Sequence, residues 1–243
     1  MELKVSKKTE NYFDKVSKKT NRKIDIEIVD RFDVEGMSAA FSPHPSLIKI
    51  SVLKDLVNDT KRLDRSLAHE ITHGLLLYDQ GYSTLKPTVQ LTDTDKRSIN
   101  LIGTMVDDIV VNKIIQDEGF EPYGESYPLT LSKEATALKK GKNFYKQFDL
   151  DPIFKARFIT SRYVLAWGFN EFYVIDSNLK VDIIKYIKSV KKQYKKLSIP
   201  CEAITESIKT NDIFCPEGHK KVTKDVLELW HLNNSVELET TIL

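Results

Sequence analysis

The sequence predicts an α+β fold, in which a small mixed sheet and two central helices precede a mainly helical C-terminal half. Two short segments, KIDIEIVD from Lys23 and LIKISV from Leu47, alternate apolar and polar residues with the period of a half-buried strand. Two longer segments, 59–78 and 94–118, carry apolar residues on nearly all sides, which is typical of buried helices. The segments that follow residue 128 show helical spacing.

The N-terminal part is expected to hold one helix and two strands. Residues 10–20 predict a short amphipathic helix, because Tyr12, Phe13 and Val16 share one face and lysines occupy the other. The clearest strand follows, since three isoleucines alternate with acidic residues in KIDIEIVD. The next segment, VEGMSAAFSPHPS (34–46), is expected to be a turn-rich loop because its prolines interrupt regular pairing.

The first central helix is expected to begin near Asn58 or Asp59 and to run through Tyr78, ending before Gly81. Leucine, isoleucine and alanine fill its last turns almost completely, as in a helix buried at the centre of a domain. A polar loop is expected over 79–91.

The second central helix is expected to start with Thr94 as its cap, to have Asp95 in its first turn and to end at Gly119. Helices are then expected within 132–148, 152–173 and 177–197. We place a soft boundary near Pro128. It divides the chain into a core of residues 1–128 and a helical region of residues 129–243 that can pack on the core as one unit.

Composition points to an ordinary globular protein. The 243 residues are 41% hydrophobic and 30% charged, and 37 basic against 35 acidic residues leave a net charge of +2. This balance gives no electrostatic reason to expect nucleic-acid binding. The N-terminus has no apolar signal region and no segment is apolar for the length of a bilayer, while two cysteines provide no disulfide framework. We therefore expect a cytoplasmic protein without a membrane partner; its oligomeric state is not indicated.

The residues that point to chemistry lie in the first central helix. His69, Glu70 and His73 form H-E-x-x-H, and histidines four residues apart lie on one face of a helix. Both imidazoles can therefore reach one Zn²⁺ ion, and histidines on so apolar a helix would be costly to bury without partners. Glu70 would lie beside a zinc-bound water and could accept its proton.

A third protein ligand is expected from the second central helix. Asp107 and Asp108 stand together among apolar residues, where desolvation penalises two carboxylates unless a positive charge is near. We favour Asp108 as the ligand because Asn112 follows it by four residues. Asn112 could then hydrogen-bond to a histidine ligand without binding the metal itself. Asp107 is the alternative ligand, or it could orient His69 or His73.

A rival third ligand lies within the same stretch. In H-E-x-x-H-x-x-G-x-x-H/D sites the third ligand comes six residues after the second histidine, which is Asp79 in this chain. The turning glycine of that arrangement is replaced here by Leu76, and the helix is expected to continue to Tyr78. Asp79 would then lie too far along the helix axis to reach a metal ion bound by His69 and His73.

The chain resembles the zincin metallopeptidases over roughly residues 10–118. The order of helix, strand, strand, H-E-x-x-H helix and acidic helix is similar to their minimal N-terminal core. It is most similar to gluzincin-like proteins, whose third ligand lies on a later helix. The D-x-x-x-N of Asp108 and Asn112 is also similar to certain predicted cytoplasmic metallopeptidases.

This resemblance implies a zincin-like core and a zinc-dependent peptidase that acts on a peptide or protein substrate. It also implies that LIKISV is the edge strand that pairs with substrate, with AAFSPHPS as the rim of the cleft. Two features depart from the gluzincin pattern: aspartates stand where glutamate is expected, and no motif supplies an oxyanion-stabilising residue. A regulatory or protein-binding module on the same scaffold is the alternative function.

Other polar residues carry weaker signals. Cys201, Cys215, His219 and His231 match no standard zinc module, so core or surface roles are expected for them. His44, between two prolines, is expected to be exposed. Tyr78, Tyr82 and Tyr127 could each donate to a tetrahedral intermediate, but nothing in the sequence chooses among them, and a role in core or surface packing is expected for each.

Overall fold

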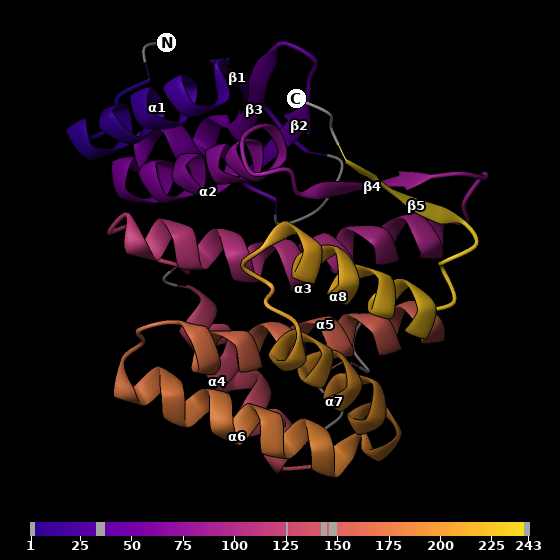
Figure 1. Ribbon diagram of the computed structural model, residues 1–243. Coiled ribbons are helices and arrows are strands. Elements are labelled where there is room, and N and C mark those ends of the chain that lie inside the picture. Colours follow the sequence, from indigo (N-terminus) through magenta and orange to yellow (C-terminus); the bar gives the residue numbers. More distant parts are fainter. Residues whose placement is uncertain (1–2, 33–36, 125, 142–144, 146–149, 241–243) are drawn as a thin grey trace. The chain divides into compact units, whose positions relative to one another are not determined.

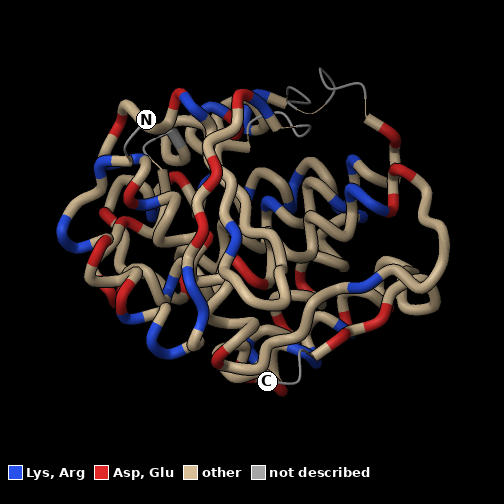
Figure 2. The backbone as a smooth tube through the Cα atoms, turned by 90° about the horizontal axis from the view of Figure 1, so that it is seen from above, with Lys and Arg blue, Asp and Glu red and all other residues tan. Residues whose placement is uncertain are grey.

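The computed structural model describes residues 3–32, 37–124, 126–141, 145 and 150–240 (Figure 1). Within these residues the fold is α+β, with eight α-helices, one three-stranded sheet and one two-stranded sheet. The α+β class expected from the sequence is therefore confirmed. None of the described helices is long and apolar enough to cross a membrane. Basic and acidic residues are interspersed along the chain (Figure 2).

The chain forms two compact units. The first takes in the described residues of 1–82 and 114–124 together with Thr240, and the second those of 83–113 and 125–239. The units are therefore interleaved along the sequence rather than consecutive. The expected division near Pro128 stays a prediction.

The first unit contains the three-stranded sheet, in the order β1-β3-β2. β3 (Leu47–Leu53) lies in the middle, parallel to β1 (Lys23–Val29) and antiparallel to β2 (Ala39–Pro43). Its alternate residues Ile48, Ile50 and Val52 are fully buried, as the alternation of LIKISV predicts. Both expected strands are confirmed.

Two expectations for this sheet are wrong. Residues 39–43 form β2 instead of loop, because pairing with β3 along one side imposes an extended conformation that the sequence AAFSP does not signal. LIKISV is the central strand of the sheet, and β2 is an edge strand. Residues 34–36 of the same expected loop lie outside the described residues.

Helix α1 (Lys7–Thr20) is capped at both ends and packs on α2 (Thr60–Tyr78), as Figure 1 shows. The Ser6 hydroxyl accepts a hydrogen bond from the backbone of Thr9, and Asn21 takes the left-handed conformation that ends the helix. The buried Tyr12 hydroxyl lies 2.8 Å from the Thr72 hydroxyl, which joins the two helices.

Helix α2 follows a short 3-10 helix, η1 (Lys54–Asn58), and starts at the N-cap Asp59, as expected from the sequence. It packs against β2 and β3. At Gly74 the helix backbone approaches β3 so closely that an added Cβ would lie 2.9 Å from Cγ2 of Ile48. Close packing at Gly74 therefore fixes α2 on the sheet, next to His73.

The second unit is mainly helical. Its two-stranded sheet pairs β4 (Ser83–Pro87) with β5 (Val236–Thr240). Its helices are α3 (Asp93–Asp117, whose last residues belong to the first unit), α4 (Ser126–Lys139), α5 (Pro152–Phe172), α6 (Ser177–Gln193), α7 (Lys195–Thr210) and α8 (Pro216–Leu229).

The structure of these residues differs from the sequence expectations in three places. The loop expected over 79–91 is wrong at 83–87, which form β4. Thr92 rather than Thr94 caps α3, since its hydroxyl accepts a 3.1 Å hydrogen bond from the Asp95 backbone. The helix expected within 132–148 is α4, which ends at Lys139. Residues 142–144 and 146–149 lie outside the described residues.

A buried ion pair joins the helices of the second unit. Arg162 on α5 donates two hydrogen bonds to the Glu134 carboxylate on α4, at 2.6 and 3.2 Å. The Tyr145 hydroxyl donates to the same carboxylate at 2.9 Å and lies 2.8 Å from the hydroxyl of Tyr186 on α6. Bidentate geometry and the extra tyrosine compensate the desolvation of both charges.

We expect Gly74→Ala to destabilise the protein by roughly 1–3 kcal/mol, because the new methyl group overlaps Ile48 in a packed interface. The measurement is the free energy of unfolding in urea. In an Ile48→Ala background the clash is gone, and Gly74→Ala should then be neutral or stabilising because alanine favours helix by about 1 kcal/mol. An equal loss in both backgrounds would contradict this account of the packing.

The two cysteines should differ in reactivity. Burial raises the pKa of Cys201 to about 12, whereas Cys215 is half-buried at the N-cap of α8. At pH 8 only about one in ten thousand Cys201 thiols would be ionised, so a thiol reagent such as DTNB should label Cys215 and leave Cys201 until unfolding. Rapid labelling of folded Cys215→Ser protein would show that the α7 packing is wrong.

Candidate metal centre

Helix α2 presents His69 and His73 on one face, one turn apart, as H-E-x-x-H predicts. Both side chains are half-buried. Their Nε2 atoms lie 3.3 Å apart, and the ring planes meet at 71°. The two imidazoles therefore converge on one point rather than diverging into solvent.

The 3.3 Å separation has a direct chemical reading. Two imidazole nitrogens at about 2.0–2.1 Å from one tetrahedral ion lie roughly 3.3–3.4 Å from each other. The nitrogens of His69 and His73 already stand at that separation. A metal ion could thus be bound by the pair with little movement of either ring.

Glu70 is held by the edge strand of the sheet. Its Oε2 accepts a 2.8 Å hydrogen bond from the backbone N–H of Phe41 in β2. The Phe41 ring stacks on His73, with ring planes 10° apart and centroids 6.4 Å apart. One residue of β2 thus positions both the carboxylate and the second histidine of the motif. The sequence did not indicate Phe41, because nothing in it showed that residues 39–43 form a strand.

Tyr173, the C-cap residue of α5, fixes the backbone of α3 next to Asp108. The Tyr173 hydroxyl donates to the carbonyl oxygen of Ile109 at 2.9 Å and to that of Asp108 at 3.4 Å. It also interacts with the side chain of Asn112, which is 5% exposed. Burial raises the pKa of Tyr173 well above its usual value, so the hydroxyl remains a donor at neutral pH.

Asp107 has a partner that the sequence did not reveal. Its Oδ1 lies 2.8 Å from Nε2 of His219 on α8, and His219 is only 2% exposed. The two residues are 112 positions apart, and no motif links them. The CPEGH segment therefore places its histidine against Asp107, while its cysteine caps α8 by accepting from the backbone of Gly218.

Only one group of three or more potential ligands among the described residues is compact enough to hold a metal ion. It consists of His69, His73 and Asp108, with one ligand atom from each within 4.8 Å of the others. Neither Asp107 nor Asp79 belongs to it. Asp79 is the exposed C-cap residue of α2, as the uninterrupted helix to Tyr78 predicted.

The tyrosines proposed as oxyanion donors have structural contacts. The Tyr78 hydroxyl accepts from the backbone N–H of His44 at 2.7 Å and donates to its carbonyl oxygen at 2.9 Å. The turn between β2 and β3 is thereby tied to the end of α2, and His44 is half-buried rather than exposed. Tyr127 packs on Phe169, and burial raises its pKa far above the usual range; Tyr82 is also buried.

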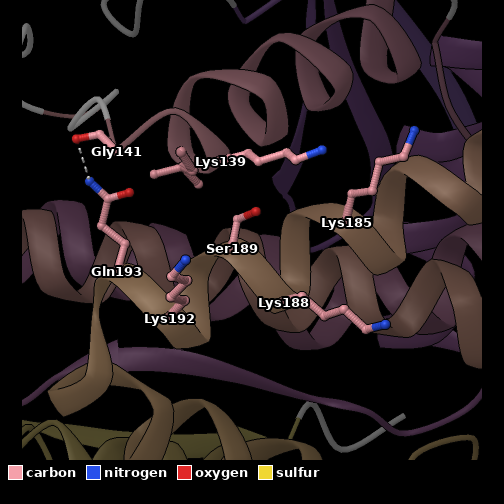
Figure 3. Close-up of a pocket in the computed structure, with 8 residues that line it drawn as sticks. Lys139, Gly141, Lys185, Lys188, Ser189, Lys192 and Gln193 are labelled. Carbon is pink, nitrogen blue, oxygen red and sulfur yellow. Dashed lines mark hydrogen bonds between the residues drawn. The ribbon is translucent and has the colours of Figure 1, made fainter.

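A concavity with different chemistry lies between α4 and α6 (Figure 3). It measures about 450 Å³ and is lined by lysines at 139, 185, 188 and 192 together with Leu138, Gly141, Ser189 and Gln193. The Gln193 amide donates to the carbonyl oxygen of Gly141 at 3.3 Å. These lining residues include no histidine, cysteine or carboxylate, so they offer no metal site.

Comparison with known protein-family models, curated proteins and solved structures finds no match for this chain. The resemblance to zincins therefore rests on the residues of the chain itself. The geometry around His69, Glu70 and His73 is then the main structural evidence for a function.

If His69, His73 and Asp108 hold a metal ion, Asp108→Ala should weaken its binding, measured with Zn²⁺, by more than the roughly 10–100-fold that loss of an outer hydrogen-bond partner causes, since Asp108 would supply a ligand atom. Competition titration with a chromogenic chelator measures the affinity. Asp107→Ala and Asp79→Ala are the matched controls, because each removes an aspartate outside the group.

An unchanged affinity in Asp108→Ala, or a larger loss in Asp107→Ala, would overturn this ligand assignment. Folding of each variant is checked by its thermal transition. Asp107→Ala also separates the metal site from the His219 contact, which it removes.

Proposed function

We propose that this protein is a zinc-dependent metallopeptidase with a zincin-like active site on helix α2. His69, His73 and Asp108 would hold the metal, and Glu70 would act as general base. The observation that carries the proposal is the 3.3 Å separation of the two imidazole nitrogens on a helix whose sequence is H-E-x-x-H. That separation suits two ligands of one tetrahedral ion.

The donor set, taken together with the H-E-x-x-H motif, favours zinc among the common metals. Two imidazoles and one carboxylate are the ligands typical of catalytic zinc, and three protein ligands leave a fourth position open for water. Mg²⁺ and Ca²⁺ prefer sets made of oxygen alone. Aspartate in place of the glutamate of gluzincins keeps the carboxylate and shortens its reach.

Zinc, when bound, would lower the pKa of a coordinated water from about 15.7 toward roughly 7 and polarise the peptide carbonyl. Glu70 would accept the proton of this water and later deliver it to the leaving amine. The hydrogen bond from the Phe41 backbone keeps the Glu70 carboxylate on the side of α2 next to His73. Asn112, Tyr173 and Asp107 would act on the position of α3 rather than on the reacting atoms.

β2 is the strand best suited to align a peptide substrate. It lies at the edge of its sheet, so its second side is not used by β1 or β3. Edge strands bind extended peptides through backbone hydrogen bonds. We therefore assign to Ala39–Pro43 the role that the resemblance gives to LIKISV. The Phe41 N–H is already bound to Glu70 and Pro43 has no N–H, so a substrate would pair mainly with carbonyl oxygens of this edge.

We expect Glu70→Gln to abolish hydrolysis of an unfolded protein such as casein while Zn²⁺ remains bound at one equivalent. Glutamine cannot accept the proton of water, but its carbonyl oxygen can still accept the Phe41 hydrogen bond, so the fold should persist. Peptide release and metal content are measured on the same samples. Glu27→Gln, which changes an exposed carboxylate on β1, is the matched control.

Chelator should remove activity from the wild-type protein, and Zn²⁺ should restore it. If the zinc-loaded protein binds unfolded chains without cleaving them, and Glu70→Gln binds them equally, the alternative of a binding module on this scaffold replaces the peptidase.

A further inference from the structure

Arg65 is a half-buried cation one helical turn before His69 on α2. Residues 65, 69 and 73 follow one another at intervals of four, so they share a face of the helix. The Nε atom of Arg65 is shielded from solvent and has no hydrogen-bond partner among the described residues. No ion pair with these residues involves its guanidinium, and the carboxylates of Glu70 and Glu121 act on it only at longer range.

The other charged residues around Arg65 already have partners. They line a cavity of about 220 Å³ in the first unit, together with Ser6, Gly119 and Phe120. Lys8 donates to the carbonyl oxygen of Gly119 and lies 4.3 Å from the ring centre of Phe120. Lys61 pairs with Glu121 at 3.1 Å.

Asp64 completes this set. Its carboxylate accepts from the backbone of Ser6, at 3.1 and 3.3 Å, and so anchors the start of α1. Each charged side chain of the cavity other than Arg65 thus has a local structural contact among the described residues.

An uncompensated cation in such a position is costly. Burial is the main influence on Arg65 and lowers the pKa of its guanidinium, and the neighbouring Arg62 acts in the same direction. A planar guanidinium with free donors matches a carboxylate, which it can bind through two parallel hydrogen bonds. The chemistry of the cavity therefore favours a small carboxylate.

Gly124 keeps the space beside the guanidinium open. A Cβ atom at this position would lie 3.3 Å from Nη2 and 3.5 Å from Cζ of Arg65. Alanine at 124 would narrow the approach without removing the charge, which provides a second way to probe the cavity.

We propose that Arg65 binds a carboxylate of the peptide substrate, a role that rests on the proposed peptidase function. One turn of helix separates Arg65 from His69, a rise of about 6 Å. An extended peptide advances about 3.3 Å per residue, so the carboxylate would lie within about two or three residues of the scissile bond. The carboxylate can be the C-terminus of the peptide or an acidic side chain.

Binding can be measured without catalysis, by following the Arg65 Nε–H resonance in full-length, zinc-loaded Glu70→Gln protein. The probes are N-acetyl-alanyl-alanine, its C-terminal amide, and N-acetyl-glutamyl-alanine amide. We expect one or both carboxylate probes to shift the resonance and the neutral amide to leave it unchanged. The probe that shifts it identifies the source of the carboxylate. No shift with either acid would overturn the proposal.

Variants test the same contact. Because Arg65→Gln lacks the reporter resonance, binding to the variants is measured by titration calorimetry; this variant should bind the active probe roughly 10–100-fold more weakly, the range of hydrogen bonds to charged groups. Gly124→Ala should weaken binding several-fold, and Arg62→Gln, the exposed neighbour, should leave it unchanged. Because the Arg65 cation is uncompensated and its Nε has no hydrogen-bond partner among the described residues, Arg65→Gln should leave the thermal transition unchanged or raise it.

The two proposals fail in different ways. If the wild-type protein does not hydrolyse peptides but the Arg65 resonance responds to carboxylate, the peptidase fails and the carboxylate site stands. If hydrolysis occurs, but the Arg65 resonance responds to neither acid and Arg65→Gln keeps the preference for acidic over amidated peptides, the carboxylate site fails and the peptidase stands.

Discussion

The separation of 3.3 Å between the imidazole nitrogens of His69 and His73 is the constraint on which the functional reading of this protein depends. The helix that carries both histidines is held in place by packing that involves no ligand. The contact of Gly74 with Ile48 fixes α2 against the central strand, and the hydrogen bond of Tyr12 with Thr72 fixes it against α1. A metal ion that bound between the two rings would therefore require little movement of helix α2.

The adjacent carboxylates of α3 have separate roles. Asp107 contacts the buried His219, whereas Asp108 belongs to the group that could hold a metal ion. The contact with His219 thus compensates the desolvation of Asp107, and a metal ion, when bound, would do the same for Asp108. β2 has a comparable double role, since one residue of this strand orients both Glu70 and His73.

Local patterns in the sequence were sufficient to predict the helices and strands whose hydrophobic periodicity is strong. The alternation of KIDIEIVD and LIKISV, and the cap and apolar face of α2, predicted those elements and placed His69 and His73 on one face. Ala39–Pro43 and Ser83–Pro87 were missed because pairing with distant residues, rather than local preference, makes them strands. The contact between His219 and Asp107 could not be predicted for the same reason, since 112 residues separate the two in the sequence.

X-ray absorption spectroscopy of the zinc-loaded protein tests the central claim most directly, because it reports the ligands and their distances. We expect two imidazole nitrogens and one carboxylate oxygen at about 2.0–2.2 Å, with a water as the fourth ligand. The imidazole contribution should fall to one ligand in His73→Ala. A spectrum with sulfur ligands, or with no histidine contribution, would contradict this account of the protein.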